Sequence, residues 1–329
     1  MTSKNPPDVP HPLRTLGARI WAERTILGPL CLVVFVSLAY FVGPPAWNQN
    51  SRFALTRAMV ERASFDIDPD HHTTGDKSFR EGHFYSDKAP GSSLLAALPY
   101  AVTLAIIEVS GAEKPGIEVR PLDPILAEAG QVPDIDRMQP GDRLIYNQSY
   151  RVAQYIARLF SVSLLAVGGV LAMWMLVFRL THSRRQALWV SATAALATPA
   201  FAYGAALYGH QSCAVFLLVA LALTVATDAS RAAPELRASF DRATPLLVGT
   251  SLGWAVLCEY PAAIPVVLLV GFATARRGLR FGLWVALGGL PWALLLAAYH
   301  TLAFGGPLQT GYDFVYLEQF AEGMRVAYG

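Results

Sequence analysis

The chain has 329 residues, of which 53% are hydrophobic and only 15% are charged. Soluble domains carry about 25% charged residues, so this deficit indicates that lipid solvates much of the chain. The formal net charge is +2, which leaves no strongly basic surface for nucleic acid. Cys31, Cys213 and Cys258 each lie in an apolar run without a ligand-spaced Cys or His, which argues against a disulfide framework and a zinc site.

The N-terminal segment, residues 1–24, is polar and leads into an apolar run with no small-residue cleavage site, so we interpret that run as a retained membrane anchor. A helix that crosses a bilayer needs about 20 mostly apolar residues. The run 246–273 is interrupted by Glu259-Tyr260-Pro261, which predicts two short helices. The other predicted crossings lie at 25–42, 152–178, 187–203, 213–226 and 281–303.

Basic residues indicate how these runs are oriented, because short cytoplasmic loops are enriched in Lys and Arg. They cluster before residue 25 and at 179–185, 231–242 and 276–280. The clusters alternate correctly only if 246–273 turns at the outer face and 91–109 does not cross. We therefore predict seven crossings of a bacterial inner membrane, a cytoplasmic N-terminus and one periplasmic region, 44–150. The competing interpretation, in which 91–109 spans, breaks the alternation.

The predicted periplasmic region has four parts. Residues 51–62 place apolar residues on one helical face, as in a helix that lies among lipid headgroups. A polar loop at 66–88 precedes the apolar run 91–109, which we expect to be a re-entrant or interfacial helix. Residues 111–149 are rich in acidic residues and proline, which favours irregular, solvated structure.

Two carboxylates one residue apart, Asp66 and Asp68, form the first candidate site. Such a pair can hold a divalent metal or act as a general base towards a hydroxyl group. The alternative is a solvated acidic turn with Pro69 at its bend, and the pattern does not decide between them. A divalent metal is the one cofactor that the sequence permits here.

The second candidate site lies around Lys88. Pro90 and Gly91 suit a helix start, with Ser92 in its first turn. The free N–H groups of a helix start attract anions, and Lys88 adds a point charge, so we predict phosphate binding here. The alternative is that Lys88 extends to the membrane interface with Asp87 as its partner.

A third group lies at the outer ends of predicted crossings and comprises His210, Glu259 and Tyr260. Ionisable residues at membrane depth are often functional, and we expect these side chains to line a substrate cavity with Tyr85. Satisfied structural groups are the alternative.

Three segments carry a resemblance to a known family. They are Arg52-Phe53-Ala54 with Arg57 and Met59, then Tyr85-Ser86-Asp87-Lys88-Ala89-Pro90-Gly91, and finally Ala303-Phe304-Gly305-Gly306-Pro307. In their order and spacing they resemble the GT-C glycosyltransferases, specifically bacterial relatives of protein O-mannosyltransferases and of lipid A aminoarabinose transferases.

The resemblance implies an all-α polytopic membrane protein, with a GT-C-like core of seven transmembrane helices over residues 25–303. It implies an inverting transfer of a sugar from a polyprenyl-phosphate donor to a lipid, glycan or protein acceptor at the periplasmic face. We expect the donor phosphate to contact Lys88, Arg52, Gly91 and Ser92.

One departure bears on catalysis. Gln49 and Asn50 occupy the positions of the family's Asp-Glu pair, and neither amide can act as a base. The base must then be Asp66, Asp68 or Asp87, or the chain is a non-catalytic scaffold. A lipid-linked-sugar transporter is a further alternative, but the sequence shows no convincing internal repeat. Residues 304–329 are expected to begin a later periplasmic loop, and the family continues beyond such a point, which fits either a fragment or a shortened form.

Overall fold

The structure is a computed structural model that describes residues 18, 20–43, 46–120, 143–226 and 242–317. It is mostly helical, at 77%. Within the described residues, three helices are long and apolar enough to cross a membrane: Gly91–Ser110, Gln148–Thr181 and Leu279–Phe304. At this level the prediction of a mostly helical chain with helices able to cross a membrane is confirmed.

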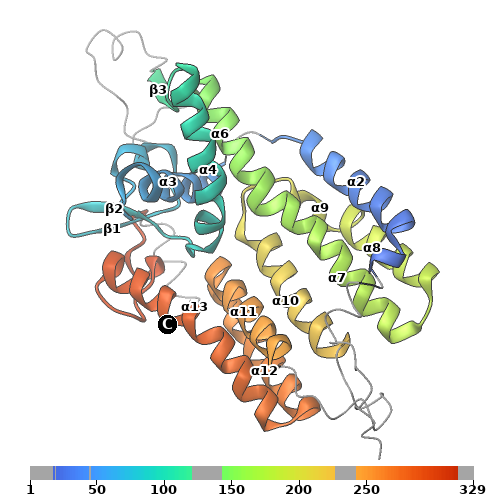
Figure 1. Ribbon diagram of the computed structural model, residues 1–329. Helices are drawn as coiled ribbons and strands as arrows, with labels where there is room; N and C mark the ends of the chain where they lie inside the picture. The colour runs from blue at the N-terminus through green and yellow to red at the C-terminus, as the bar shows by residue number, and fades with distance from the viewer. Residues whose placement is uncertain (1–17, 19, 44–45, 121–142, 227–241, 318–329) are drawn as a thin grey trace, which may run out of the picture.

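The elements follow one another along the chain as labelled in Figure 1. Besides the helices, the structure contains two antiparallel hairpins that the all-α prediction did not include, β1 with β2 and β3 with β4. The bounds are α2 (Arg24–Tyr40), α3 (Trp47–Arg62), η1 (Asp68–Thr73), β1 (Lys77–Arg80), β2 (His83–Ser86), α4 (Gly91–Ser110), β3 (Ile117–Arg120), β4 (Arg143–Tyr146), α6 (Gln148–Arg158), η3 (Leu159–Ser163), α7 (Leu164–Thr181), α8 (Arg184–Leu196), α9 (Pro199–Gly204), α10 (Gly209–Ala226), α11 (Ala243–Cys258), η6 (Tyr260–Ala262), α12 (Ala263–Arg277), α13 (Leu279–Phe304) and η7 (Gly311–Phe314).

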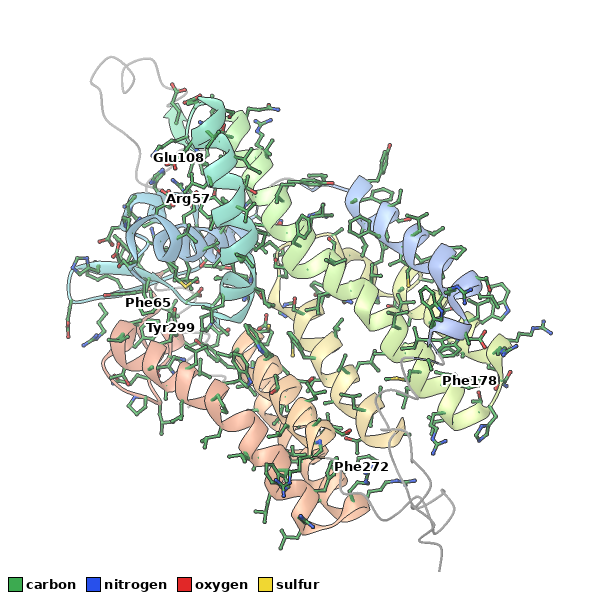
Figure 2. All side chains as sticks on the ribbon, in the orientation of Figure 1. Arg57, Phe65, Glu108, Phe178, Phe272 and Tyr299 are labelled. Atoms are coloured by element: carbon green, nitrogen blue, oxygen red, sulfur yellow. The ribbon has the colours of Figure 1, made fainter. Side chains whose placement is uncertain are left out.

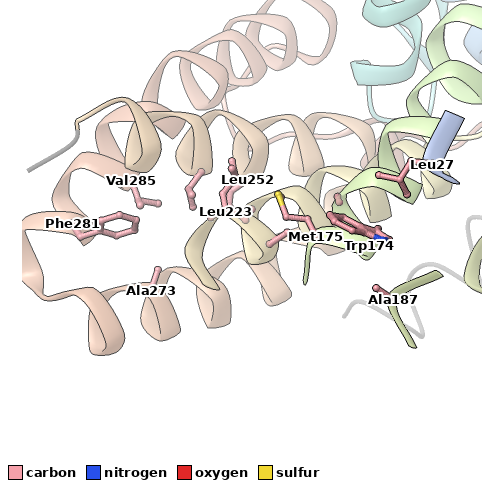
Figure 3. Packing of buried hydrophobic residues seen from close by; sticks show 13 residues of the cluster. Leu27, Trp174, Met175, Ala187, Leu223, Leu252, Ala273, Phe281 and Val285 are labelled. Atoms are coloured by element: carbon pink, nitrogen blue, oxygen red, sulfur yellow. The ribbon is translucent and has the colours of Figure 1, made fainter. Parts of the chain in front are cut away.

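The apolar core joins α7, α10, α11 and α13. Trp174 and Met175 of α7 belong to the same buried cluster as Leu252 of α11 and Val285 of α13 (Figure 3). A Cβ at Gly249 would lie 1.9 Å from the Val285 carbonyl oxygen, so α11 and α13 touch backbone to backbone. Small residues that let helices approach this closely are typical of packing within membranes.

The break predicted in the run 246–273 is confirmed. The helix α11 ends at Cys258, Glu259 is extended (φ −150, ψ 120), and α12 follows a short 3₁₀ turn that contains Pro261. The prediction of one continuous helix over 187–203 was wrong, because α8 ends at Leu196 and α9 begins at Pro199. Proline lacks the N–H that a continuing helix needs and forces the residue before it out of the helical region.

The helix that begins with α6 extends past its neighbours. It continues through the π-helical η3 into α7, and its 34 residues span about 51 Å at the usual rise per residue, whereas a hydrocarbon core is about 30 Å thick. The Tyr155 hydroxyl of α6 donates to the Ala39 carbonyl near the end of α2, at 3.2 Å. The part of α6 before Tyr155 therefore projects beyond the end of α2.

The helix α4 lies along this projecting part. Its start packs against the end of α11, and its Ala96 and Tyr100 share a buried cluster with Tyr150 and Ala153 of α6. In Figure 1 α3, the β1–β2 hairpin and α4 gather at one end of the apolar helices. In Figure 2 Phe65 lies beside Tyr299 at that end, whereas Phe178 and Phe272 lie towards the opposite end.

The helix α3 differs from the predicted headgroup helix. Residues 50–56 are all buried, and the helix contacts α4, η1 and β2. Most of this helix therefore packs against other segments of the chain, and its buried polar side chains form hydrogen bonds with those segments.

Candidate functional site

The site is built around Arg52 on α3, whose side chain is only 1% exposed. Its Nη2 lies 2.7 Å from the Glu259 Oε1, and its Nη1 donates to the Ala89 carbonyl at 3.1 Å. The Asn48 Oδ1 accepts from Nε at 3.0 Å. One guanidinium thus joins α3 to the β2–α4 connection and to the α11–η6 connection.

Two glycines let these segments converge. A Cβ at Gly91 would lie 2.5 Å from the Leu257 carbonyl carbon, and one at Gly209 would lie 2.3 Å from the Cys258 carbonyl oxygen. The starts of α4 and α10 therefore press on the end of α11, and only residues without a side chain allow this approach.

This packing changes the interpretation of Gly91 and Ser92. Both residues are buried, and the Ser92 Oγ lies 3.5 Å from the Arg52 Nη1. The Ser93 hydroxyl donates to the Arg52 carbonyl at 2.8 Å. The sequence predicts an open helix start that receives phosphate, whereas the structure shows a helix start packed against α3 and α11. In the structure these residues hold Arg52 in place.

Lys88 lies between two carboxylates. Its Nζ is 3.2 Å from the Asp87 Oδ2 and 3.2 Å from the Asp76 Oδ2. The hairpin explains why they meet, since its register pairs Lys77 with Ser86 and so leads Asp76 and Asp87 out of the strands side by side. Both carboxylates raise the pKa of Lys88, outweighing the opposite effect of its burial.

Asp87 is the most perturbed carboxylate of the site. Its side chain is buried, and its Oδ1 has no hydrogen-bond partner among the described residues. Burial raises the pKa of Asp87 to about 6, although Lys88 acts in the opposite direction. A carboxyl group with this pKa is deprotonated at neutral pH and still basic enough to accept a proton, which is the property of a general base.

Glu259 has a second partner, because the His210 Nδ1 lies 3.0 Å from its Oε1. Burial alone would raise the pKa of Glu259, but the hydrogen bond from His210 and the charge of Arg52 outweigh it and lower that pKa. The His210 side chain is 48% exposed, far more than its partner. His210 therefore lies where the site opens.

Aromatic residues close another side of the site. The Tyr312 ring centroid lies 6.0 Å from the Lys88 Nζ and 5.7 Å from the Tyr260 ring. Tyr260 donates to or accepts from the His300 Nε2 at 3.1 Å. A Cβ at Gly311 would lie 2.5 Å from the Asp87 Cα, so the segment after α13 packs directly on the backbone of Asp87.

An apolar groove of about 590 Å³ leads to these aromatic residues. It lies between α11, α12 and α13, and its lining runs from Gly249 and Val285 to His300 and Thr310. The Thr310 hydroxyl accepts from the backbone N–H of Tyr312 at 3.3 Å. Thr310 at the end of the groove is thus hydrogen-bonded to Tyr312, whose ring lies beside Lys88.

The structure places Asp66 and Asp68 in other interactions. Asp66 pairs with Arg62 at 2.8 Å, and Asp68 accepts from the Phe84 N–H and pairs with His83, both at 2.7 Å. Burial acts to raise the pKa of Asp66, but its hydrogen bond with Ser64 and the charge of Arg62 outweigh burial and lower it. No contact among the described residues joins either carboxylate to Arg52 or Lys88. The Asp66 carboxylate is thus tied to the end of α3, and the Asp68 carboxylate to the start of β2.

Tyr85 also differs from its predicted position in a substrate cavity. Its ring centroid lies 5.7 Å from that of Phe304, and Tyr85 forms an isolated bridge with Asp66. Together with Ala303 and Leu55, Phe304 belongs to a buried cluster against which Tyr85 packs. Tyr85 therefore packs the hairpin onto the end of α13.

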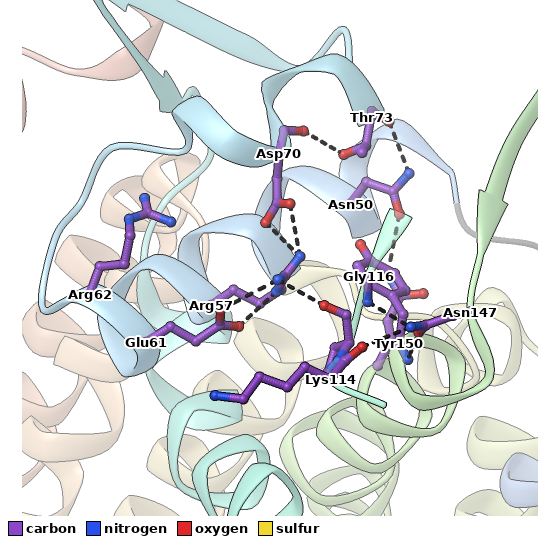
Figure 4. A network of polar contacts seen from close by, with 12 residues as sticks. Asn50, Arg57, Glu61, Arg62, Asp70, Thr73, Lys114, Gly116, Asn147 and Tyr150 are labelled. Atoms are coloured by element: carbon purple, nitrogen blue, oxygen red, sulfur yellow. Dashed lines mark hydrogen bonds and ion pairs between the residues drawn. The ribbon is translucent and has the colours of Figure 1, made fainter. Parts of the chain in front are cut away.

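The amide side chains of Gln49 and Asn50 have structural partners. The Gln49 Oε1 accepts from the Leu207 N–H at 3.1 Å. Asn50 donates to the Thr73 carbonyl at 2.9 Å and to the Tyr146 hydroxyl at 2.8 Å (Figure 4). Both residues fix α3 to its surroundings.

A separate ionic network holds the other face of α3. In Figure 4 Arg57 lies between Asp70 and Glu61, each at 2.8 Å. Burial raises the pKa of Asp70 despite the charge of Arg57. This network anchors η1 to α3 and so supports the base of the hairpin that carries Asp76 and Asp87.

Sequence reasoning missed two members of the site, Asp76 and Tyr312. A signal for Asp76 was present, because Asp76-Lys77 and Asp87-Lys88 are two Asp-Lys pairs on either side of a hairpin. For Tyr312 the sequence gives no local signal, since its position depends on how the segment after α13 folds back. Within the described residues, no group of three or more His, Cys, Asp or Glu is arranged to hold a metal ion.

Of the predicted residues, the structure thus brings together Arg52, Asp87, Lys88, His210, Glu259 and Tyr260, with Gly91 and Ser92 packed behind them. We name these and the two additional residues, Asp76 and Tyr312, the Arg52–Lys88 site. Comparison of the chain with protein-family models, with curated proteins and with solved structures gives no match.

Proposed function

We propose that this chain is an inverting glycosyltransferase that uses a polyprenyl-phosphate sugar at the outer face of a bacterial inner membrane. The observation that carries the proposal is the position of Lys88. It lies between Asp76 and Asp87, beside the Arg52–Glu259 pair. The Tyr312 ring lies 6.0 Å from its Nζ, and the Tyr312 N–H donates to Thr310, which lines the apolar groove. A lipid-linked phosphate sugar needs an apolar channel, a cation for its phosphate and a base for the acceptor, and this arrangement offers each.

Lys88 binds the donor phosphate in this proposal, with Arg52 in support. The bond between the anomeric carbon and the phosphate oxygen breaks as the sugar leaves, and negative charge develops on the phosphate. A cation at that position stabilises the transition state more than the bound substrate. Both cations are already paired, Arg52 with Glu259 and Lys88 with Asp76 and Asp87, so the donor phosphate takes the place of part of this pairing. Lys88 is the more exposed of the two, at 13% against 1%, and is therefore the cation that the phosphate reaches.

Asp87 acts as the general base. The acceptor hydroxyl oxygen attacks the anomeric carbon from the face opposite the phosphate, and its proton passes to the Asp87 carboxylate. The polyprenyl phosphate leaves with the electron pair of the broken bond. The unpartnered Oδ1 and the pKa of about 6 favour Asp87 over Asp66 and Asp68, which are engaged in the hairpin.

The groove between α11, α12 and α13 holds the isoprenoid chain of the donor. Its lining is mostly aliphatic and aromatic, and it ends at His300 and Thr310 near the Tyr260–Tyr312 wall. A lipid bound there would place its phosphate towards Lys88, which lies beyond Tyr312.

The membrane topology also belongs to the proposal. We propose seven crossings with a cytoplasmic N-terminus, and α4 outside the hydrocarbon core. The position of α4 beside α6, beyond the end of α11, supports this over a crossing, although its 20 apolar residues are long enough to span.

A labelling experiment tests this topology. In a variant without native cysteines, Ala112→Cys should react with a membrane-impermeant maleimide in intact spheroplasts, and Arg184→Cys only after permeabilisation. Protection of residue 112 in intact spheroplasts would contradict the proposal and favour a spanning α4.

Activity is tested with the purified chain in lipid nanodiscs and a panel of radiolabelled polyprenyl-phosphate sugars. Transfer to added acceptors, or slow transfer to water, should release polyprenyl phosphate from at least one donor. If the chain binds polyprenyl phosphate but releases none from any donor, the transferase proposal fails and the scaffold interpretation takes its place. If the chain in sealed proteoliposomes moves the intact donor across the bilayer, a transporter is indicated.

A further inference from the structure

A second cationic pocket lies outside the Arg52–Lys88 site. It has a volume of about 360 Å³ and is formed by the end of α2, the start of α3 and α6. Its lining includes Arg151 and Arg158 but neither Asp nor Glu, and it shares no residue with the Arg52–Lys88 site. Polar side chains of Gln154, Tyr146 and Tyr155 complete the wall.

Arg158 is the unusual member of this pocket. Its side chain is only 4% exposed, and it forms no ion pair with any described residue. Its Nη1 contacts the carbonyl oxygens of Leu38 at 2.9 Å, Phe41 at 3.2 Å and Ala205 at 2.8 Å. These carbonyls end α2 and α9, so Nη1 caps two helix ends, whose partial negative charge stabilises the buried cation.

The capping role leaves the rest of the guanidinium unexplained. Both Nε and Nη2 are buried and have no hydrogen-bond partner among the described residues. These two atoms form one edge of the guanidinium, which is the edge that binds two oxygens of a phosphate or carboxylate in parallel. Buried polar groups are nearly always satisfied, and a buried charge needs a counter-charge, so an unpaired edge of this kind points to a missing anion.

Arg151 lies two turns earlier on the same helix and provides a second charge. Its Nε donates to the Tyr146 carbonyl at 3.1 Å, and the residue is exposed at the pocket mouth. The Tyr155 ring lies 4.9 Å from the Arg158 guanidinium carbon. Because the Arg158 edge has almost no exposed surface, an anion that enters would reach it through a small shift of Arg158 or of Tyr155.

We propose that the pocket lined by Arg151 and Arg158 binds a phosphate group, with the free edge of Arg158 as its bidentate donor and Arg151 as the outer cation. A phospholipid headgroup and a soluble phosphate share this chemistry. The inference does not depend on the glycosyltransferase proposal, because it uses none of the residues assigned to transfer.

The test uses the full chain in dodecyl maltoside micelles, with the Lys88→Met substitution throughout so that the other site does not contribute. Two probes are measured at constant ionic strength set with chloride: binding of inorganic phosphate by isothermal titration, and retention of phosphatidylglycerol by native mass spectrometry. Arg158→Lys keeps the charge and a donor for the helix ends but lacks the bidentate edge. It should weaken binding of at least one probe about tenfold.

Arg151→Gln is the second variant, chosen because an exposed side chain can be changed without loss of folding. It should weaken the same probe by a smaller factor, about threefold to tenfold. Arg184→Lys, at an exposed position on α8, is the control and should bind as the parent does. A loss confined to phosphatidylglycerol identifies a lipid headgroup, and a loss of inorganic phosphate identifies a soluble anion. If Arg151→Gln and every folded Arg158 variant bind both probes like the parent, the proposal is overturned.

Discussion

Arg52 and Arg158 are both buried, but they differ in the groups that neutralise their charge and accept their hydrogen bonds. Arg52 has a carboxylate partner at 2.7 Å, and its other donors reach a side-chain amide and backbone carbonyls. Arg158 meets only carbonyl oxygens on one nitrogen, and no described acidic residue faces it. The comparison teaches that burial of a cation does not by itself identify a site. What matters is whether its charge and its donors are already used.

The difference follows from the segments that meet at each position. At Arg52 the α11–η6 break turns Glu259 towards α3, so the protein supplies its own anion. At Arg158 two helix ends meet, and their carbonyls provide only partial negative charge. The first region can therefore fold around a complete ionic network, whereas the second is complete only with an external anion.

The largest expected effect is on Asp87, which belongs to the region with a complete network. Asp87→Asn removes the proposed base and leaves the shape unchanged, so turnover should fall by about 10²–10⁴-fold. Rates are measured by release of radiolabelled polyprenyl phosphate, with thermal unfolding to show that the variant folds. Glu81→Gln, in the exposed hairpin turn, is the matched control. Parental turnover by Asp87→Asn would return Asp66 and Asp68 to consideration.

Glu259→Gln tests how much the Arg52–Glu259 ion pair contributes to stability. This change leaves Arg52 buried without a counter-charge, so the free energy of unfolding should fall by about 3–5 kcal/mol. Glu23→Gln breaks the pair with Arg184, whose side chain is 69% exposed, and should cost about 1 kcal/mol or less. Unfolding is followed in detergent for both variants. Equal losses would show that the Arg52 region does not depend on its internal anion.

The groove is tested by filling it. Ala297→Trp places a large side chain among residues that line the groove, whereas Ala298→Trp changes a neighbouring exposed position outside the lining. The first should raise KM for a long-chain donor about tenfold and leave KM for a short-chain analogue nearly unchanged. The second should affect neither. A similar loss with both donors would place the isoprenoid chain elsewhere.

The smallest expected effect is a shift in pH dependence. Because burial raises the pKa of Asp87 to about 6, its carboxylate form, and hence kcat/KM, should rise with pH through about 6 and then level off. The same shift favours the protonated group in the folded state, so this contribution to stability is lost as pH rises through about 6.

Lys88→Met sharpens that test, because Lys88 lowers the pKa of Asp87. The pH at which kcat/KM rises should therefore be higher in this variant than in the parent. Lys114→Met, which removes an exposed lysine paired with Glu108, should leave this pH unchanged. If kcat/KM of Lys88→Met rises at the same pH as that of the parent, a group other than Asp87 controls the pH dependence.

Local sequence signals predicted much of the helical framework. Apolar runs indicated the helices, and Glu259-Tyr260-Pro261 marked the break between α11 and α12 because a proline that lacks the helical N–H follows an ionisable residue there. Proline alone does not decide this, since Pro29, Pro99 and Pro291 lie inside helices. The break at Pro199 was overlooked, which is why one predicted helix is two in the structure. The ion pair of Lys88 with Asp87 was offered by the sequence as the alternative to phosphate binding, and the structure contains this pair.

The rest depended on contacts between distant segments. Arg52 and Glu259 are 207 residues apart, and no local pattern says that they meet. Asp66 and Asp68 looked at least as suitable as Asp87 for a base, and only the hairpin, with its ties to Arg62 and His83, separates them. The sequence by itself determined which segments are apolar, where helices stop and which residue types are available for chemistry. Tertiary structure decided which charges are paired, because pairing depends on the convergence of α3, α4, α10 and α11, and glycines at 91 and 209 permit that convergence only in the folded chain.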